Sequence, residues 1–317
     1  MTSSAVSSGK DARASNLDPI QAVPALFVVL WATGFIGARA GMPHAEPGTF
    51  LAMRFALALV LLAGIAFVLR APWPRGRAAW GALVVGALVH GIYLGGVFWA
   101  VRHGMPAGVA AVIVGLQPVV TTALAGGWVG ARLGLDERVG ARHWVGLALG
   151  VVGVVLVLWP KLDLQPDLGL DVSGSGITPS TIGACALACL AVSLGTVLQK
   201  RVGATVDLRS GTALQYGGAL VPVGLLALTE TNAVSWTGEL VFALLWLTLV
   251  LSLGAVFLLM WLIREGSVAR VSALFFLVPT VAALMAWALY GEALGPIQIA
   301  GMALTAIAVW LGARRKE

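Results

Sequence analysis

Residues 78–101 read AAWGALVVGALVHGIYLGGVFWAV, and after Arg102 residues 103–131 read HGMPAGVAAVIVGLQPVVTTALAGGWVGA. Neither run contains a Lys, Arg, Asp or Glu. About 20 predominantly apolar residues cross the hydrocarbon core of a bilayer as one helix, and a backbone in lipid must satisfy its polar groups internally. The two runs therefore predict two consecutive membrane-spanning helices joined at Arg102.

The rest of the chain has the same apolar character. Of its 317 residues, 59% are hydrophobic and 11% are charged, whereas globular proteins carry about 25% charged residues. Runs of 18 to 29 residues without charge, or with Arg54 alone, occupy ten segments: 19–38, 47–69, 78–101, 103–131, 143–160, 172–199, 210–229, 240–263, 271–291 and 293–313. Membrane β-strands alternate over about ten residues and do not match these runs. The sequence predicts an all-α integral membrane protein with ten transmembrane helices.

The basic residues predict the orientation. Of 20 Lys and Arg residues, 16 fall on the side of the N-terminus, three on the opposite side, and Arg54 within a helix. This bias predicts a multi-pass protein of the plasma (inner) membrane with cytoplasmic N- and C-termini. Because the topology accounts for the net charge of +6, we expect the lipid bilayer as a partner and no nucleic acid. Residues 1–18 are predicted to form a disordered cytoplasmic tail.

The chain divides into two similar halves. A polar linker, residues 161–176, separates a first repeat at 19–160 from a second at 177–317. An offset of 161 residues relates Arg39 to Lys200, Arg54 to Gln215 and Pro118 to Pro279. With five helices in each half, the two repeats have opposite orientations in the membrane. Such inverted repeats are typical of secondary transporters, whose substrate sites lie near the midplane between the halves.

These landmarks resemble the drug/metabolite transporter superfamily, specifically the ten-helix EamA-type permeases. The matching features are residues 31–35, Arg54, the Leu-Gln-Pro at 116–118, the Leu-Val-Pro at 277–279, and the Glu-x8-Gly junctions at 137–146 and 292–301. The resemblance implies a cavity lined by helices 1, 3, 4, 6, 8 and 9, with helices 5 and 10 at the periphery. Among the subfamilies, the exporters of amino acids, including the aromatic amino-acid exporter branch, are the most similar.

Deep carboxylates are absent from the predicted helices. All 14 Asp and Glu residues fall in tails, in loops or at helix ends. Proton- and sodium-coupled carriers often use buried carboxylates as coupling sites. The sequence therefore disfavours cationic substrates and carboxylate-based proton antiport.

Neutral polar and aromatic residues at mid-helix are the candidates for substrate binding. The selected residues are Trp31, Phe35, His90, Tyr93, Gln117, Thr121, Ser193, Phe275 and Phe276. Packing is the alternative for each aromatic ring, and hydrogen bonding within its own helix is the alternative for each hydroxyl. His90 either relays a proton or binds substrate, or it is a core residue whose polar atoms are satisfied.

Three other intramembrane residues have different expected roles. Arg54 either binds a substrate carboxylate or has a structural role, pairing with helix-end carbonyls or extending toward the interface. Pro118 and Pro279 interrupt helices 4 and 9 at equivalent depths and are candidate hinges.

Together these features predict a secondary transporter. Its expected substrates are small neutral or zwitterionic metabolites, with amino-acid export the preferred case, moved by alternating access. A facilitative channel or an uptake permease for another small metabolite is the alternative. No nucleophile with a base, metal triad or carboxylate pair lies at membrane depth, so an enzyme is not expected. We expect no cofactor or metal, and a monomer or homodimer.

Overall fold

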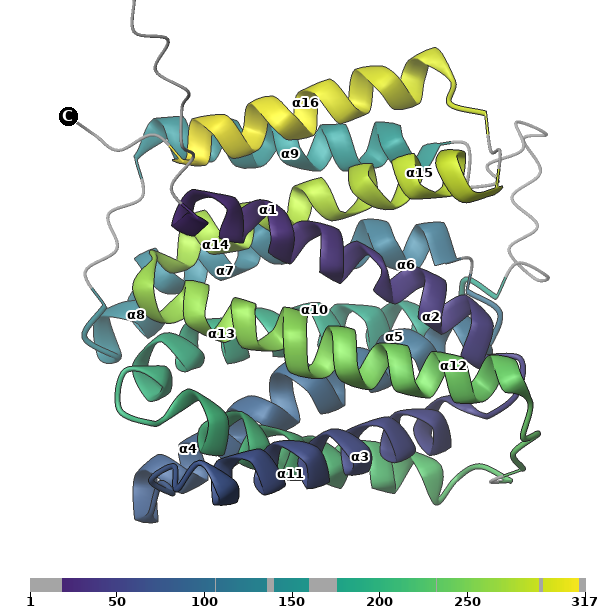
Figure 1. Ribbon diagram of the computed structural model, residues 1–317. Helices are drawn as coiled ribbons and strands as arrows, with labels where there is room; N and C mark the ends of the chain where they lie inside the picture. The colour runs from purple at the N-terminus through teal and green to yellow at the C-terminus, as the bar shows by residue number, and fades with distance from the viewer. Residues whose placement is uncertain are drawn as a thin grey trace, which may run out of the picture.

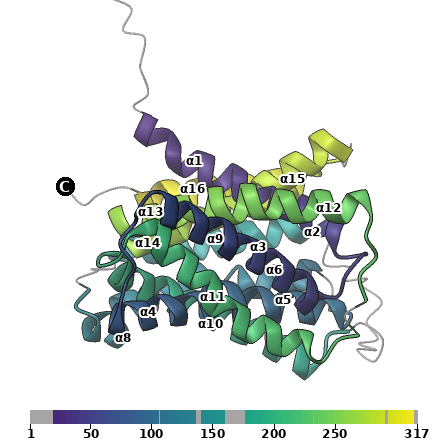
Figure 2. The same cartoon turned by 60° about the horizontal axis from the view of Figure 1, so that its bottom comes forward.

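A computed structural model describes residues 19–105, 107–135, 140–159, 176–231, 233–290 and 293–313. Within these residues the regular structure is helical, apart from one isolated β-bridge between Ala45 and Val234. The helices run roughly side by side as a bundle, which Figures 1 and 2 show from two directions. The predicted tail at 1–18, most of the linker, Glu137 and Glu292 lie outside the described residues.

The described residues of the first half form nine α-helices and one π-helical segment. They are α1 (Pro19–Ala32), α2 (Gly34–Gly41), α3 (Pro47–Val68), α4 (Gly76–Gly86), η1 (Ala87–Ile92), α5 (Tyr93–Arg102), α6 (Ala107–Val114), α7 (Gln117–Gly126), α8 (Trp128–Arg132) and α9 (Ala141–Leu158). Several of these are consecutive parts of one predicted span, because α4, η1 and α5 together cover the run at 78–101.

The second half has a parallel organisation. Its elements are α10 (Pro179–Gly203), α11 (Leu208–Ala227), α12 (Gly238–Trp246), η4 (Leu247–Ala255), α13 (Val256–Glu265), α14 (Val268–Ala273), η5 (Leu274–Phe276), α15 (Leu277–Tyr290) and α16 (Pro296–Ala313). The π-helical segment η4 interrupts the third span of this half as η1 does in the first. A π-helix winds more residues into each turn and often marks a functional position.

Seven helices in the described residues are long and apolar enough to cross a membrane, and two shorter apolar helices accompany them. The predicted all-α integral membrane class is confirmed. The predicted span at 210–229 corresponds to α11, which is outside both of these groups. It carries Gln215 and Tyr216 in its interior, and both are buried against other helices.

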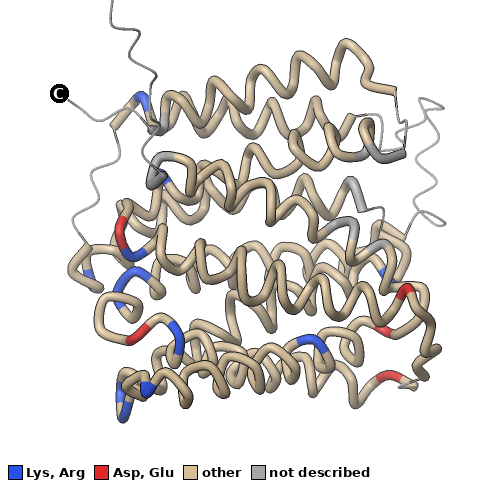
Figure 3. Tube along the Cα trace, viewed as in Figure 1, with Lys and Arg blue, Asp and Glu red and all other residues tan. Residues whose placement is uncertain are grey.

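Charged residues gather at the two ends of the bundle (Figure 3). We call one the acidic end: Glu46, Glu230 and Glu239 lie there, in hydrogen bonds that join the loops around α3 and α12. We call the other the basic end, where these residues lie: Arg70, Arg75, Arg77, Arg132, Lys200, Arg201, Arg209, Arg264 and Arg270. Apart from Arg54 in α3, the layer between the ends is uncharged in the described residues, which matches a membrane interior.

Glycines allow two helix pairs to approach closely. On α4 and α11, a Cβ at Gly86 would overlap the backbone of Gln215, and one at Gly218 would overlap the backbone of Leu83. On α9 and α16, a Cβ at Gly153 would meet the carbonyl oxygen of Gly301 at 2.9 Å. Small residues at such crossings are typical of membrane bundles, because close backbone packing replaces the hydrophobic driving force.

Candidate functional site

A cavity of about 640 Å³ extends from the middle of the bundle to the acidic end. Its volume lies in the range of small-molecule sites, about 300–1,000 Å³. The lining comes from α1, α2, α5, α6, α7 and α9 of the first half and from α10, η5 and α15 of the second. The resemblance implies that the eighth predicted span, residues 240–263, lines the cavity, but none of these residues does so. The fifth span, α9, which the resemblance puts at the periphery, contributes Val154. The cavity therefore lies where the two halves meet.

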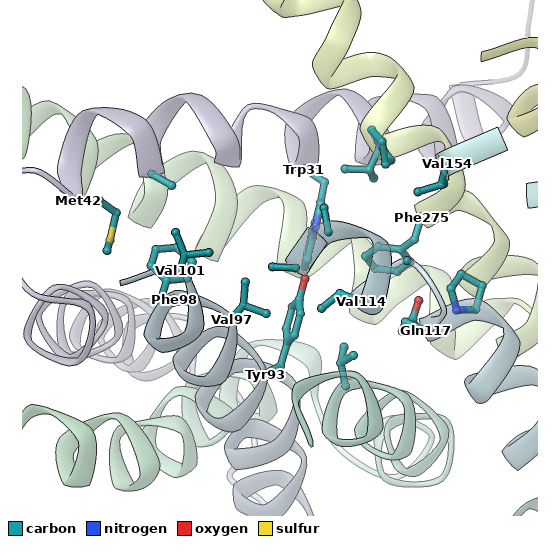
Figure 4. Close-up of a pocket in the computed structure, with 18 of the residues that line it drawn as sticks. Trp31, Met42, Tyr93, Val97, Phe98, Val101, Val114, Gln117, Val154 and Phe275 are labelled. Atoms are coloured by element: carbon teal, nitrogen blue, oxygen red, sulfur yellow. The ribbon is translucent and has the colours of Figure 1, made fainter. Parts of the chain in front are cut away.

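Aromatic rings form one wall of the cavity (Figure 4). The ring of Trp31 meets the edge of Phe275, with centroids 5.3 Å apart, and Phe27 packs behind both at 5.4 and 5.5 Å. Tyr93 and Phe98 come from α5. Figure 4 shows Tyr93 and Trp31 pointing toward one another. Such rings offer a large apolar surface with two polar atoms, the indole nitrogen and the phenol oxygen.

The polar floor of the cavity is built around Gln117. Its side chain is 3% exposed, and its Nε2 donates to Thr121 Oγ1 at 3.0 Å. Ser193 Oγ donates to the backbone oxygen of Gln117 at 3.3 Å. Thr121 and Ser193 are therefore behind Gln117 rather than in the lining.

The two spans that contain Pro118 and Pro279 are both broken beside the cavity. Helix α6 ends at Val114 and α7 begins at Gln117, so that the chain turns at Gly115 and Leu116. In the second half the 3₁₀ segment η5 separates α14 from α15. Pro118 and Pro279 follow these two breaks, and both line the cavity. Each proline lacks the N–H that a continuous helix would require.

The structure thus brings together four of the nine candidate binding residues: Trp31, Tyr93, Gln117 and Phe275. Phe276 is 1% exposed and packs beside Gly150 in the interface of α9 with α16. Phe35 belongs to α2, and its side chain lies outside the described part of the chain. Phe98 and Arg102 also line the cavity, and neither is among the candidates that the sequence indicates.

His90 faces away from the cavity. Its ring stacks on Tyr216 of α11, with centroids 4.9 Å apart and planes 16° apart, and it is 2% exposed. Its Nε2 has no hydrogen-bond partner among the described residues. The structure therefore places His90 within the packing of η1 against α11.

Arg54 also lies outside the cavity lining. It is 4% exposed, and its Nε donates to Ser252 Oγ in η4 at 3.1 Å. The hydroxyl of Tyr216 donates to the backbone oxygen of Ser252 at 3.0 Å. The guanidinium therefore points into the bundle rather than toward the interface, and it donates to a hydroxyl rather than to a helix-end carbonyl.

One charged residue lines the cavity in the described structure. Arg102 ends α5 at the acidic end, where its guanidinium lies 4.0 Å from Glu46. At the same end, the Glu230 carboxylate accepts hydrogen bonds from the backbone N–H groups of Gly48 and Thr49. These are among the first N–H groups of α3, and a carboxylate at a helix N-terminus is favourable.

The basic end of the bundle is closed beneath the cavity. The Lys200 ammonium donates to the backbone oxygens of Arg264 at 2.8 Å and Gly266 at 2.6 Å, tying α10 to the end of α13. Beside it, Ala125, Val197 and Val268 form a buried apolar cluster. The 161-residue offset between the halves relates Lys200 to Arg39 in the sequence. That relation does not indicate the contact of Lys200 with the end of α13.

Comparison with known proteins supplies the family. The EamA-like transporter family matches residues 22–159 and again residues 179–313. The chain belongs to this family. The EamA-like architecture therefore accounts for the two halves and for the apolar bundle. Transport is the activity after which the family is named.

Several relatives match over most of their length. One in Synechocystis sp., named as the uncharacterized transporter sll0355, is 28% identical, covering 91% of this chain and 88% of the relative. One in Salmonella typhimurium, named as a probable amino-acid metabolite efflux pump, is 27% identical, covering 88% and 89%. A crystal structure 19% identical in sequence superposes with a TM-score of 0.71 over 92% of this chain and 95% of the other, which shows the shared fold.

Proposed function

We propose that this EamA-like protein is a secondary transporter that moves small metabolites without net charge across the inner membrane by alternating access. The observation that carries the proposal is the cavity between the two halves, which reaches the acidic end while Lys200 and its apolar neighbours close the basic end. A site open toward one side and closed toward the other is what alternating access requires. A channel would need a continuous path through both ends.

Inverted halves supply the movement in this proposal. In this proposal the described helices make up the ten spans that the sequence predicts, five in each half, and the breaks before Pro118 and Pro279 lie beside the cavity. We infer that these breaks are the hinges about which the halves rock. From the bias of basic residues we infer that the basic end and both termini lie in the cytoplasm, so that the cavity faces outward in this conformation.

Amino acids and their derivatives are the proposed substrates, and export is the proposed direction. Support comes from the neutral polar and aromatic lining and from the Salmonella relative named as a probable amino-acid metabolite efflux pump. The cavity lining contains no carboxylate in the described residues, which disfavours cations. Uptake of another small metabolite is the remaining alternative, and it predicts the same site with the opposite flux.

Transport in vesicles tests the proposal. Purified protein in liposomes preloaded with unlabelled solute is expected to accelerate exchange of at least one labelled neutral amino acid or amino-acid amide. The rate should saturate with concentration, because a carrier binds its substrate before moving it. Empty liposomes are the control. Inactivity across a panel of neutral metabolites would contradict the substrate class, and a rate that never saturates would favour a channel.

Cysteine labelling tests the orientation. In a variant lacking Cys185 and Cys189, we introduce Ala204→Cys at the basic end or Ser235→Cys at the acidic end, both at exposed positions. An impermeant maleimide added to intact cells is expected to label position 235 and not position 204, because the basic end faces the cytoplasm. Disrupting the cells should expose both positions. Labelling of position 204 in intact cells would invert the proposed topology.

A further inference from the structure

The side-chain oxygen of Gln117 is a buried acceptor without a donor. Gln117 lines the cavity floor, and its Oε1 makes no hydrogen bond within the described residues. Most buried polar atoms in proteins are paired, so that an exception at a cavity requires an explanation. Gln298, a second buried glutamine, shows the ordinary case: its Nε2 donates to the oxygen of Val157, and its Oε1 accepts from the N–H of Gly295.

The unpaired oxygen is held in place from behind. Thr121 accepts the hydrogen bond of the Gln117 Nε2, and Ser193 bonds its backbone oxygen. Gln117 also begins α7, directly after the break that Pro118 enforces. The amide is therefore oriented before any substrate arrives, which lowers the entropic cost of binding.

The walls opposite Gln117 supply neutral donors. In the described structure, neither the Trp31 indole nitrogen nor the Tyr93 hydroxyl forms a hydrogen bond with another residue. Figure 4 shows both side chains and Gln117 around the same space. The acceptor and the two donors belong to residues that line the same cavity with aromatic rings around it. A carboxamide on a ring presents the matching N–H and C=O groups.

A free amino acid fits this arrangement less well. Arg102 is the one charged residue among the described residues that line the cavity. It follows Tyr93 by nine residues on α5, about 14 Å at 1.5 Å per residue. The ammonium and carboxylate of an α-amino acid are only a few bonds apart. With the amino group at Gln117, the carboxylate would lie in the apolar cavity without an opposite charge, which is costly.

The geometry points to Gln117 as the residue that selects the substrate: its Oε1 accepts a hydrogen bond from the N–H of an uncharged, ring-bearing solute such as a carboxamide. This inference rests on the proposed function and narrows its substrate class. Amino-acid derivatives without a free carboxylate bind better than free amino acids. The carbonyl of the same carboxamide accepts from Tyr93 or Trp31.

A matched pair of probes tests this selection. 2-Naphthamide and N,N-dimethyl-2-naphthamide share the ring and the carbonyl, but only the first has N–H groups. Equilibrium dialysis against purified protein in lipid nanodiscs, with empty nanodiscs subtracted, measures both affinities. We expect the unmethylated amide to bind about two- to tenfold more tightly, the contribution of one neutral hydrogen bond. Phenylalanine should compete with it poorly.

Gln117→Leu should remove this preference, bringing the two affinities within about twofold of each other, because leucine offers no acceptor. Gln298→Leu, the same change at a buried glutamine outside the cavity, should retain it. Gln117→Met repeats the test with an unbranched side chain if the leucine variant does not fold. Equal binding of the probes to the wild type, or a preference that survives in both Gln117 variants, would overturn the inference.

The two proposals fail in different ways. Absent transport in liposomes, together with a binding preference that depends on Gln117, would reject the proposed carrier and keep the selecting role of Gln117. Saturable exchange of free amino acids at a rate that Gln117→Leu leaves unchanged would keep the proposed carrier and reject the selecting role of Gln117.

Discussion

Replacing Lys200 with methionine is expected to open the basic end of the bundle. The substitution removes a charged donor from the backbone oxygens of Arg264 and Gly266. Because this end is partly exposed, we expect a loss of about 1–2 kcal/mol from the closed arrangement, which changes its population ratio about 5- to 30-fold. In a background lacking native cysteines, maleimide labelling of Ala125→Cys, a position buried beneath the cavity, should accelerate by a similar factor.

Two variants decide whether the contact or the charge matters. Arg201→Met removes the same charge from the next residue, whose side chain is exposed, and should leave labelling unchanged. Lys200→Arg retains donors of similar reach and should restore most of the protection. Equal acceleration by the Lys200 and Arg201 variants would show that charge at this end, rather than the contact, controls access.

Gly218→Leu is expected to prevent correct folding. The new side chain would overlap the backbone of Leu83, which cannot rotate away as a flexible side chain can. We expect a cost of more than about 3 kcal/mol, the upper end of the range for overpacking. Thermal unfolding in detergent, followed by size-exclusion chromatography, should show a strongly lowered midpoint or aggregated protein.

Gly224 provides the matched control on the same helix. Nothing lies within 4 Å of a Cβ built at Gly224, so that Gly224→Leu should leave the midpoint within a few degrees of the wild type. Gly218→Ala should have an intermediate effect. If both leucine variants unfold at the wild-type temperature, the close packing of α4 against α11 does not stabilise the bundle.

The sequence predicted the membrane fold well because the decisive signals are local. Charge-free runs as long as 78–101 require helices in lipid whatever their neighbours are. Trp31, Gln117, Pro118 and Pro279 are also candidates from the sequence alone, since a mid-helix indole, an amide and two prolines are visible without knowledge of helix packing, and all four line the cavity.

Which side chains of a helix point into the cavity could not be predicted in the same way. His90 and Tyr93 are three residues apart, a spacing that puts two side chains on one face of an ideal helix. The π-helical segment η1 changes the number of residues per turn between them, so that Tyr93 lines the cavity while His90 packs on α11. Phe275 and Phe276 both lie in the 3₁₀ segment η5, where Phe275 lines the cavity and Phe276 packs beside Gly150. Such irregular turns leave no periodic signal in the sequence.

Arg54 has a consequence for how the protein is made. Its hydroxyl partner, Ser252, lies 198 residues further along the chain. At about 5–20 residues per second of synthesis, roughly 10–40 s pass after Arg54 leaves the ribosome before Ser252 follows it. During that interval the guanidinium needs water or the insertion machinery as its environment. The first half thus enters the membrane incomplete, and a gene encoding that half alone would lack the hydroxyl that its buried charge requires.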